Sequence, residues 1–324
     1  MMRFKLLGIV LIVGLLMATA LGCQTDGASG GSGNGISAGS MRLATPAEWT
    51  ERADGLPNFE THYGFEYPRR DLVILELGLA YQAVGTGQAE VGIGDATEGR
   101  IAQYNLVVLE DDKQFFPAYN PAPVIRKDIL DTYPEIADIM KELSVLLELD
   151  TLTLLNKEVA VEGKQPEDVA RTFLVDQGLI SAEAAQTDPA KGTPVVVSGK
   201  TFAEALTLGY LTVYLLEDRG FTVVDEVGLA EVALIRPALE SGEIHMYWEY
   251  TGTGLMNVMG HDEVITDPQL CYELIRNWDL ENHNLVWLDY APANNTFVLF
   301  TSSEVYEQYG WTKISDFAGF FEGN

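Results

Sequence analysis

The later half of the chain alternates short apolar runs with longer segments of helical periodicity. A β-branched apolar run at 194–197 predicts a buried strand. Apolar positions then recur at helical spacing over 202–218, and Gly220 follows as a typical helix terminator. The pattern continues with a strand at 221–224, a helix at 229–239 that Pro237 should bend or shorten, and a strand at 244–248. This alternation predicts an α/β unit with a mostly parallel sheet.

The first half of the chain follows a similar pattern. It predicts strands at 41–44, 72–75, 90–93 and 106–109, and a helix at 77–86. Residues 126–179 show helical periodicity in three pieces, of which the last begins with Pro166. Residues 181–193 lack periodicity and predict a linker. The length is sufficient for two lobes with separate cores.

The N-terminus has the features of an export signal. Arg3 and Lys5 precede an apolar run at 6–21, which Ala-Leu-Gly-Cys closes at 20–23. The alternative is a single-pass anchor, for which the run is at the short limit. The boundary resembles the lipobox of bacterial lipoproteins, and this resemblance implies a signal peptide over 1–23 and a lipid on Cys23. Residues 24–40 are rich in Gly and Ser and predict a flexible tether.

Composition and charge narrow the function classes. Apolar residues make up 47% of the chain and charged residues 21%, which is ordinary for a soluble globular protein. The net charge of −28 argues against nucleic acid or an anionic membrane surface as a partner. With Cys23 acylated, Cys271 would have no cysteine left to pair with. The four histidines lack zinc-ligand spacing, and no serine or cysteine stands in a nucleophile motif, so we expect no metal, cofactor or catalytic residue.

Long motifs in both halves resemble one family. Residues 195–297 contain SGKTFAEA, ALESGEIHMYWEYTGTGL and WLDYAPANNTF. Residues 43–179 contain WTERADGLP, LAYQAVGTGQAEVG, TEGRIAQYNLVVLEDDKQFFPAYNPAPVIR and VEGKQPEDVARTFL. Together they resemble the substrate-binding proteins of glycine betaine/choline (osmoprotectant) ABC transporters. The resemblance implies an α/β, two-lobed type II periplasmic-binding-protein fold with an interlobe cleft.

The two halves stand in reversed order relative to that family, in which the SGK-type segment comes first and the FFPAYN-type segment comes last. The reversed order resembles a circular permutation; a gene-model error or a trimmed tandem duplicate are the alternatives. A permuted chain implies a discontinuous lobe 2 at 41–119 plus 296–324. Lobe 1 would be continuous at 120–295 and would contain the linker at about 181–193.

The resemblance also implies a ligand site. A trimethylammonium group donates no hydrogen bond and is held by aromatic faces, whereas a carboxylate needs Arg, Lys or hydroxyl donors. Tyr250 of EYTGT and Tyr119 of FFPAYN match cage tyrosines, and Phe297 of NNTF stands where the family has Tyr. The residues that match the carboxylate-binding groups are Thr253, Lys200 and Arg52.

Three further positions depart from the family pattern. Asp95 of GDATEGR stands where the family often has an aromatic residue, and Ala205 replaces a glutamine. Trp248 stands where the family commonly has proline and is a candidate for a substitute cage wall. An aspartate beside the cage favours choline or another ligand without a carboxylate, whereas Arg52 and Lys200 favour betaine. Ligand identity therefore stays open.

Several of these residues also have purely structural interpretations. Phe297 fits a sheet core. Arg52 fits a surface ion pair with Asp54 or Glu51, and Lys200 fits a helix cap. Taken together, however, the motifs favour a pocket.

The resemblance implies an extracytoplasmic solute-binding protein, anchored to the cell membrane as a lipoprotein and not an enzyme. It would capture a small quaternary-ammonium osmolyte and deliver it to an ABC transporter permease. The alternative is an extracellular sensing domain that reports such a solute to a receptor or permease without delivering it. A tethered hydrolase is disfavoured because no catalytic constellation is visible in the sequence.

Overall fold

The structure is a computed structural model that describes residues 41–52, 54–181, 192–229 and 232–321. The predicted signal peptide, Cys23, the tether and most of the predicted linker lie outside the described residues. Within the described part of the chain, no helix is long and apolar enough to cross a membrane.

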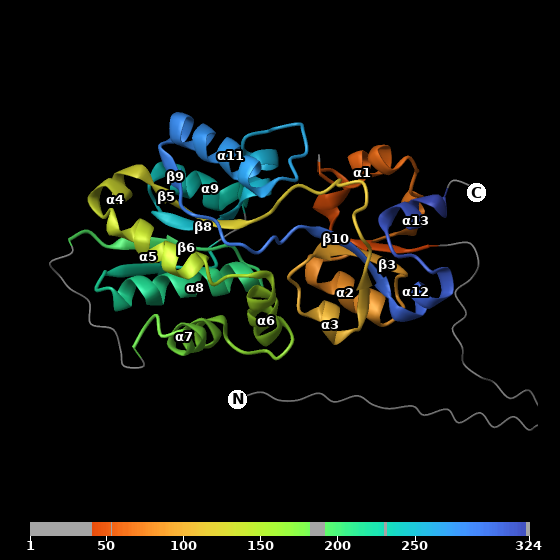
Figure 1. Cartoon of the computed structure of the whole chain (residues 1–324), viewed down its shortest axis with the longest axis horizontal. Helices are drawn as coiled ribbons and strands as arrows, with labels where there is room; N and C mark the ends of the chain where they lie inside the picture. The colour runs from red at the N-terminus through yellow and green to blue at the C-terminus, as the bar shows by residue number, and fades with distance from the viewer. Residues whose placement is uncertain (1–40, 53, 182–191, 230–231, 322–324) are drawn as a thin grey trace, which may run out of the picture. The chain divides into compact units, whose positions relative to one another are not determined.

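The described strands form two five-stranded sheets (Figure 1). The first sheet has the order β2-β1-β3-β10-β4. Its strands are β1 (Leu43–Thr45), β2 (Leu72–Ile74), β3 (Val91–Asp95), β4 (Leu106–Val108) and β10 (Phe297–Ser302). The second sheet has the order β7-β6-β8-β5-β9. Its strands are β5 (Pro121–Arg126), β6 (Val195–Ser198), β7 (Val223–Glu226), β8 (Met246–Tyr250) and β9 (Leu285–Trp287). We call the first sheet with its helices lobe 2, and the second sheet with its helices lobe 1.

The two sheets repeat one topology. In lobe 2, β1 lies between β2 and β3 in parallel pairing, and in lobe 1, β6 lies between β7 and β8 in the same way. The strand that arrives from the other lobe inserts antiparallel, β10 between β3 and β4 and β5 between β8 and β9. This architecture confirms the predicted α/β, two-lobed type II periplasmic-binding-protein fold. The predicted domain boundaries and the permuted order stay predictions.

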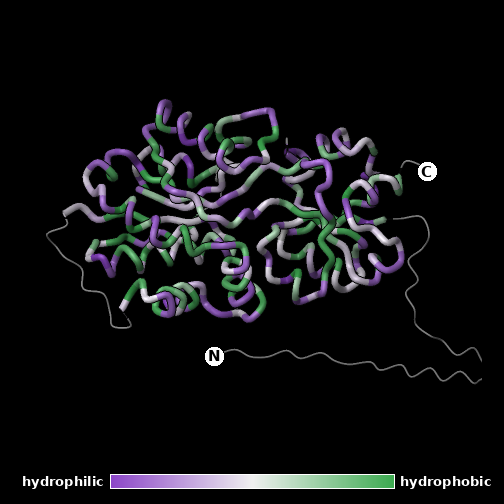
Figure 2. The backbone as a smooth tube through the Cα atoms, viewed as in Figure 1, coloured by the Kyte–Doolittle hydropathy of each residue, from purple (hydrophilic) through white to green (hydrophobic). Residues whose placement is uncertain are grey.

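Lobe 2 is built around close packing at β3. The helices of this lobe are α1 (Leu56–Tyr63), α2 (Leu77–Gly85), α3 (Arg100–Gln103), α12 (Ser303–Tyr309) and α13 (Ile314–Gly319), with 3₁₀ turns η1 (Ala47–Thr50) and η2 (Arg69–Asp71). Tyr81 of α2 stacks on Phe300 of β10 with ring centroids 4.6 Å apart. Gly92 and Gly94 of β3 leave room for these rings, because a Cβ at either position would collide with Phe300 or Tyr81. Figure 2 shows hydrophobic segments at the centre of this lobe and hydrophilic segments on its outer helices.

The sheet of lobe 1 separates two hydrophobic cores. The helices of this lobe are α4 (Lys127–Thr132), α5 (Glu135–Ser144), α6 (Leu149–Ala160), α7 (Pro166–Asp176), α8 (Ala203–Asp218), α9 (Val232–Ser241), α10 (Thr251–Thr253) and α11 (Pro268–His283), with the π-helix η4 (Gly254–Val258). Met246 and Trp248 of β8 belong to the core that contains α5 and α8, whereas Tyr247 belongs to the core under α9 and α11. Successive strand residues face opposite sides, which accounts for this division.

The structure corrects three details of the sequence prediction. Residues 126–179 form four helices rather than three, because the segment is interrupted before Pro134. Pro237 lies inside α9, which continues to Ser241, so the helix is not shortened, and a bend at Pro237 stays a prediction. Strand β5 was not predicted because it contains Pro121 and Pro123. Their carbonyls accept from Ala291 and Leu288 on the β9 side, so the missing N–H groups leave the ladder with β8 intact.

Candidate functional site

Most of the predicted site residues lie where strands end. Asp95 is the last residue of β3 and pairs in register with Phe297, the first residue of β10. Tyr250 is the last residue of β8, and Tyr119 lies two residues before β5. Thr253 follows β8 in α10 and is nearly buried. In open α/β sheets, the carboxyl ends of the strands are where ligands bind.

In lobe 2, four side chains form a compact group. Arg52 donates from Nε to Asp54 Oδ1 at 2.8 Å and from Nη2 to Asp54 Oδ2 at 2.7 Å. The Tyr119 hydroxyl donates to Asp54 and accepts from Arg52 Nη2 at 3.3 Å. The Arg52 guanidinium lies 5.2 Å from the centroid of the Phe297 ring, which meets the Tyr119 ring edge to face at 5.7 Å. The ion pair suggested by the sequence is therefore present, but Asp54 is fully buried rather than at the surface.

In lobe 1, Lys200 holds a similar position beside an aromatic ring. Its Nζ donates to Glu249 Oε1 and lies 5.0 Å from the centroid of the Tyr250 ring. Glu249 also accepts from the Tyr250 N–H at 2.8 Å and from the Tyr247 hydroxyl at 2.9 Å. Both charged side chains are buried. Lys200 is therefore the partner of a buried glutamate.

The centre of the site is a residue that the sequence reading did not select. Glu204 of α8 is 2% exposed, and its carboxylate accepts four hydrogen bonds. Oε1 accepts from the Tyr250 hydroxyl at 2.8 Å and from Asn295 Nδ2 at 3.0 Å. Oε2 accepts from the Thr97 hydroxyl and from Asn156 Nδ2, both at 2.6 Å. Thr97 follows β3 of lobe 2 and Asn156 belongs to α6 of lobe 1, so Glu204 joins the two lobes.

Two further contacts connect the lobes beside Glu204. Arg100 Nη2 of α3 donates to the carbonyl of Ala160 at 3.1 Å. Gly99 lies directly against the backbone of α6, because a Cβ there would stand 2.6 Å from Lys157 Cα. A glycine is needed at this position for the close approach. The only sequence signal for Glu204 was its place in SGKTFAEA, four residues after Lys200.

Asp95 adds a second acidic group to the site. It is partly buried, and its pKa is raised to about 8, first by burial and then by the negative charge of Glu204. Arg52 acts in the opposite direction on this pKa. Burial, and then Glu204, also raises the pKa of the Tyr250 hydroxyl well above its usual value. Asp95, Glu204 and Tyr250 thus lie in one electrostatic neighbourhood.

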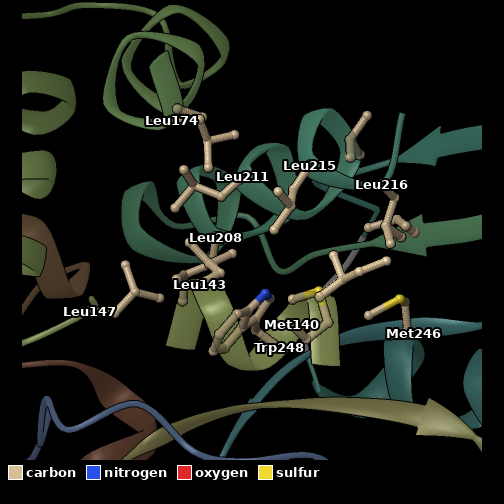
Figure 3. Close-up of a cluster of buried hydrophobic side chains, with 14 of the residues drawn as sticks. Met140, Leu143, Leu147, Leu174, Leu208, Leu211, Leu215, Leu216, Met246 and Trp248 are labelled. Atoms are coloured by element: carbon tan, nitrogen blue, oxygen red, sulfur yellow. The ribbon is translucent and has the colours of Figure 1, made fainter. Parts of the chain in front are cut away.

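Trp248 is a correction to the predicted site. It is 2% exposed and packs in the core with Leu143, Leu147 and Leu208 (Figure 3). Its Nε1 donates to Thr212 Oγ1 of α8 at 2.8 Å. The indole is therefore part of the interior of lobe 1 and does not replace a cage wall.

A cavity of about 320 Å³ lies against Phe297. Its lining includes Glu110, Asp111, Phe116, Asn294 and Thr296. These residues border the two segments that connect the lobes. Phe297 is 8% exposed and also carries Arg52 on its ring, so it is both a packing residue and a wall of open space. None of the other predicted ligand-binding residues lines this cavity, so the cage role of Phe297 stays a prediction.

The described residues offer little support for a metal site or a reactive thiol. Across residues 41–321, leaving out those not described, no group of three or more His, Cys, Asp or Glu is placed to hold a metal ion. Cys271 is fully buried, and burial raises the pKa of its thiol to about 11. The thiol packs beside Ala118 and Leu255 as a small apolar residue.

The chain is similar to several substrate-binding proteins. A glycine-betaine-binding protein of Pseudomonas aeruginosa is 37% identical over 143 residues, 44% of this chain and 46% of that protein. The carnitine transport binding protein OpuCC of Listeria monocytogenes is 35% identical over 127 residues, 39% of this chain and 41% of that protein. The chemotactic signal transduction system substrate-binding protein CosB of Halobacterium salinarum is 32% identical over 127 residues, 38% of each chain.

The chain spans less than half the length of these curated relatives in each match. The family model covers far more of it, with residues 33–176 and 193–322 matched in two blocks. That model describes the substrate-binding domain of the ABC-type glycine betaine transport system, OpuAC. The chain belongs to this family.

Proposed function

We propose that the chain is an extracytoplasmic solute-binding protein that captures a small quaternary-ammonium solute for an ABC importer. The observation that carries the proposal is that Tyr250 of lobe 1 donates to the buried Glu204, which also accepts from Thr97 of lobe 2, while Tyr119 and Phe297 form an aromatic pair at the connecting segments. Aromatic faces and carboxylates are the groups that attract a cation unable to donate hydrogen bonds. Family membership and the glycine betaine and carnitine named in its relatives support the same ligand class.

Ligand exchange requires the lobes to separate. The two connecting segments are tied to each other, because the Asn295 N–H donates to the Tyr119 carbonyl at 3.1 Å and the Tyr119 N–H donates to Asn294 Oδ1 at 2.8 Å. We place the hinge at these residues, near 119–121 and 295–298. Rotation there would break the contacts of Glu204 with Thr97 and expose the site.

Attachment to the membrane and the permuted order are parts of the same proposal. Cys23 would carry the lipid, and the tether at 24–40 would lead into β1 of lobe 2. The permuted order is supported by the equal topology of the two sheets and by the adjacent connecting segments, since a chain that starts in either lobe can form the same strand pairs. Mass spectrometry of the membrane fraction, with Cys23→Ser as the control, tests the lipid.

The ligand class is tested by calorimetry on the full chain with glycine betaine, choline and carnitine. Tyr250→Ala should lose at least about tenfold in affinity for the tightest ligand, because the ring face is removed. Tyr250→Phe retains the ring and should keep most of that affinity. The assigned pocket is wrong if Tyr250→Ala and Tyr119→Ala both bind as tightly as the unaltered chain.

The relative from Halobacterium salinarum favours a second candidate, in which the chain reports its ligand to a signalling receptor. Uptake of radiolabelled ligand in cells with and without the chain separates the two. Loss of uptake on deletion supports delivery, whereas intact uptake with a lost behavioural response to the ligand supports sensing.

A further inference from the structure

Exposed apolar side chains recur at equivalent positions in the two lobes. Helix α2 follows the edge strand β2 and leads to β3, and α9 follows the edge strand β7 and leads to β8. The third residue of each helix is an exposed leucine, Leu79 at 47% and Leu234 at 69%. Three residues before the start of each helix stands another exposed apolar residue, Ile74 at 50% and Leu229 at 48%. We call Ile74 with Leu79, and Leu229 with Leu234, the two apolar pairs.

The likeness of the two helices extends to their buried faces. Two buried residues follow each leucine, Ala80 and Tyr81 in α2 and Ile235 and Arg236 in α9, and the residue after them is exposed. Each helix therefore turns the same face inward and presents its leucine on the same outward face. Single exposed apolar side chains are common on protein surfaces, but chance does not account for four at matched positions.

Both apolar pairs lie on the side of the molecule away from the hinge. The connecting segments lead into β10 and β5, which lie next to the edge strands β4 and β9. Strands β2 and β7 form the opposite edges, and they run parallel to the strands that end at Asp95 and Tyr250. The apolar pairs thus stand at the mouth of the space between the lobes. Because points far from a hinge move most when lobes close, the distance between the two pairs reports closure.

Acidic residues accompany both apolar pairs. Glu76 belongs to the segment of the first pair, and Glu226 ends β7 ahead of the second. Both acids are exposed, and neither forms an ion pair with another described residue. Arg100, beside the start of α2, and Arg236 of α9 are both paired with carboxylates. A complementary partner therefore offers apolar sockets with Lys or Arg at their rims, whereas a second copy of this chain would set acid against acid.

We propose that the two apolar pairs dock into the membrane permease, and that the permease presents one kind of socket twice, as two copies of one subunit. The inference rests on the proposed function and names the surface and the symmetry of its partner. Matched pairs on the two lobes fit matched sockets, and two identical subunits supply them. Both pairs engage together only at the spacing that one degree of closure sets, so docking is bivalent in that state and monovalent in others.

The first test is photo-crosslinking in cells that import the ligand. The full chain carries p-benzoylphenylalanine in place of Leu79 or of Leu234, and the crosslinked peptides are identified by mass spectrometry. Both positions should crosslink to the same segment of one permease polypeptide. The control position is Leu280, which is 40% exposed on α11 beside the opposite edge strand β9 and should give no permease crosslink. Crosslinks to two different permease polypeptides, to a second copy of the chain or to a signalling receptor overturn the inference.

The second test separates docking from ligand binding. Leu79→Glu and Leu234→Glu should each lower uptake at least about tenfold, because a carboxylate is costly to bury in an apolar socket. Both variants should bind the ligand by calorimetry as tightly as the unaltered chain, which also shows that they fold. Leu280→Glu should leave uptake unchanged. An effect confined to one lobe, or no larger than that of Leu280→Glu, overturns the inference.

The outcomes distinguish this inference from the proposed function. Normal uptake by both glutamate variants overturns the inference and leaves the proposed function standing. Absence of binding for glycine betaine, choline and carnitine, or uptake that does not require the chain, overturns the proposed function and the inference with it. The crosslinks decide the inference even where a glutamate variant fails to fold.

Discussion

The two lobes each offer an aromatic ring, a basic side chain over that ring and an acid that holds the basic side chain. In lobe 1 these are Tyr250, Lys200 and Glu249, and the side chain of Lys200 is only 4% exposed. In lobe 2 they are Phe297, Arg52 and Asp54, and the Arg52 side chain is 16% exposed. The buried lysine has one carboxylate oxygen to satisfy it, whereas the arginine forms two parallel bonds and reaches solvent.

This difference makes the lobe 1 group the fixed, structural half of the site and the lobe 2 group the adaptable half. A buried ammonium is fixed because no water replaces its partner, while the partly exposed Arg52 guanidinium has further N–H donors that solvent can reach. We therefore expect changes in lobe 1 to act mainly on folding and changes in lobe 2 mainly on ligand binding. Four experiments break or sharpen this comparison.

The largest effect is expected from Lys200→Met, which leaves Glu249 buried without a counter-ion. Loss of one partner of a buried pair costs about 3–5 kcal/mol of unfolding free energy. Urea unfolding followed by circular dichroism measures it. Lys200→Met combined with Glu249→Gln should recover most of the loss. Lys164→Met, which breaks the surface pairs of Lys164 with Glu158 and Glu162, is the matched control and should leave the unfolding free energy almost unchanged.

A similar cost for both lysine variants would show that Lys200 is not structurally fixed. The contrast between the two halves of the site would then fail. Recovery in the double variant distinguishes loss of a charge partner from loss of packing, because the double variant still lacks the Lys200 ammonium.

The next effect is expected at the junction of the lobes. Glu204→Ala removes the acceptor of four hydrogen bonds and should lower the unfolding free energy by about 3 kcal/mol, since each buried donor left unpaired costs about 1–3 kcal/mol and part of this is recovered by hydration. Thr97→Val removes only the bond from lobe 2 and should cost about 1 kcal/mol. Thr97→Val could instead lower the unfolding free energy as much as Glu204→Ala does. The hydrogen bond between the lobes would then account for most of the contribution of Glu204 to stability, and its bonds inside lobe 1 for little.

The sequence was sufficient for the fold class but not for strands β5, β9 and β10 or for the electrostatic arrangement of the site. Periodicity located most strands of both sheets within a few residues, and motifs brought Tyr250, Tyr119 and Phe297 to strand ends. The role of Glu204 was not visible, because its four partners come from segments as far apart as 97 and 295. Trp248 was misplaced for a related reason. Motif position identified its strand, but only the observed packing shows that its ring faces α8.

The third prediction concerns pH and applies to the lobe 2 half of the site. Burial, followed by the charge of Glu204, raises the pKa of Asp95 to about 8. A bound cation favours the ionised form, so affinity for choline should rise with pH by about tenfold between pH 7 and pH 9 and level off above. The groups that act on this titration are Glu204, Glu98, Glu48 and Arg52 on Asp95 itself, with Tyr81 and Tyr250 beside it.

The pH dependence of stability has the opposite sign to the pH dependence of choline affinity. The folded chain holds the Asp95 proton more tightly than the unfolded chain does, so the contribution of Asp95 to stability falls as pH rises from about 4 to about 8. In Asp95→Asn, both the choline affinity and the unfolding free energy should depend less on pH. Choline affinity that is independent of pH in the unaltered chain contradicts this account. Calorimetric titrations at pH 7, 8 and 9 measure the slope.

The smallest effect is expected from removing single hydroxyl groups on the two sides of the site. Tyr119→Phe leaves Asp54 with both bonds from Arg52, so it should cost about 0.5–1 kcal/mol of unfolding free energy. Tyr250→Phe removes one of four donors to the fully buried Glu204 and should cost slightly more, about 1–1.5 kcal/mol. Thermal unfolding of both variants at one pH measures the difference. A larger cost for Tyr119→Phe would reverse the assignment of the fixed and adaptable halves, because it would mean that the lobe 2 group cannot rearrange around the loss.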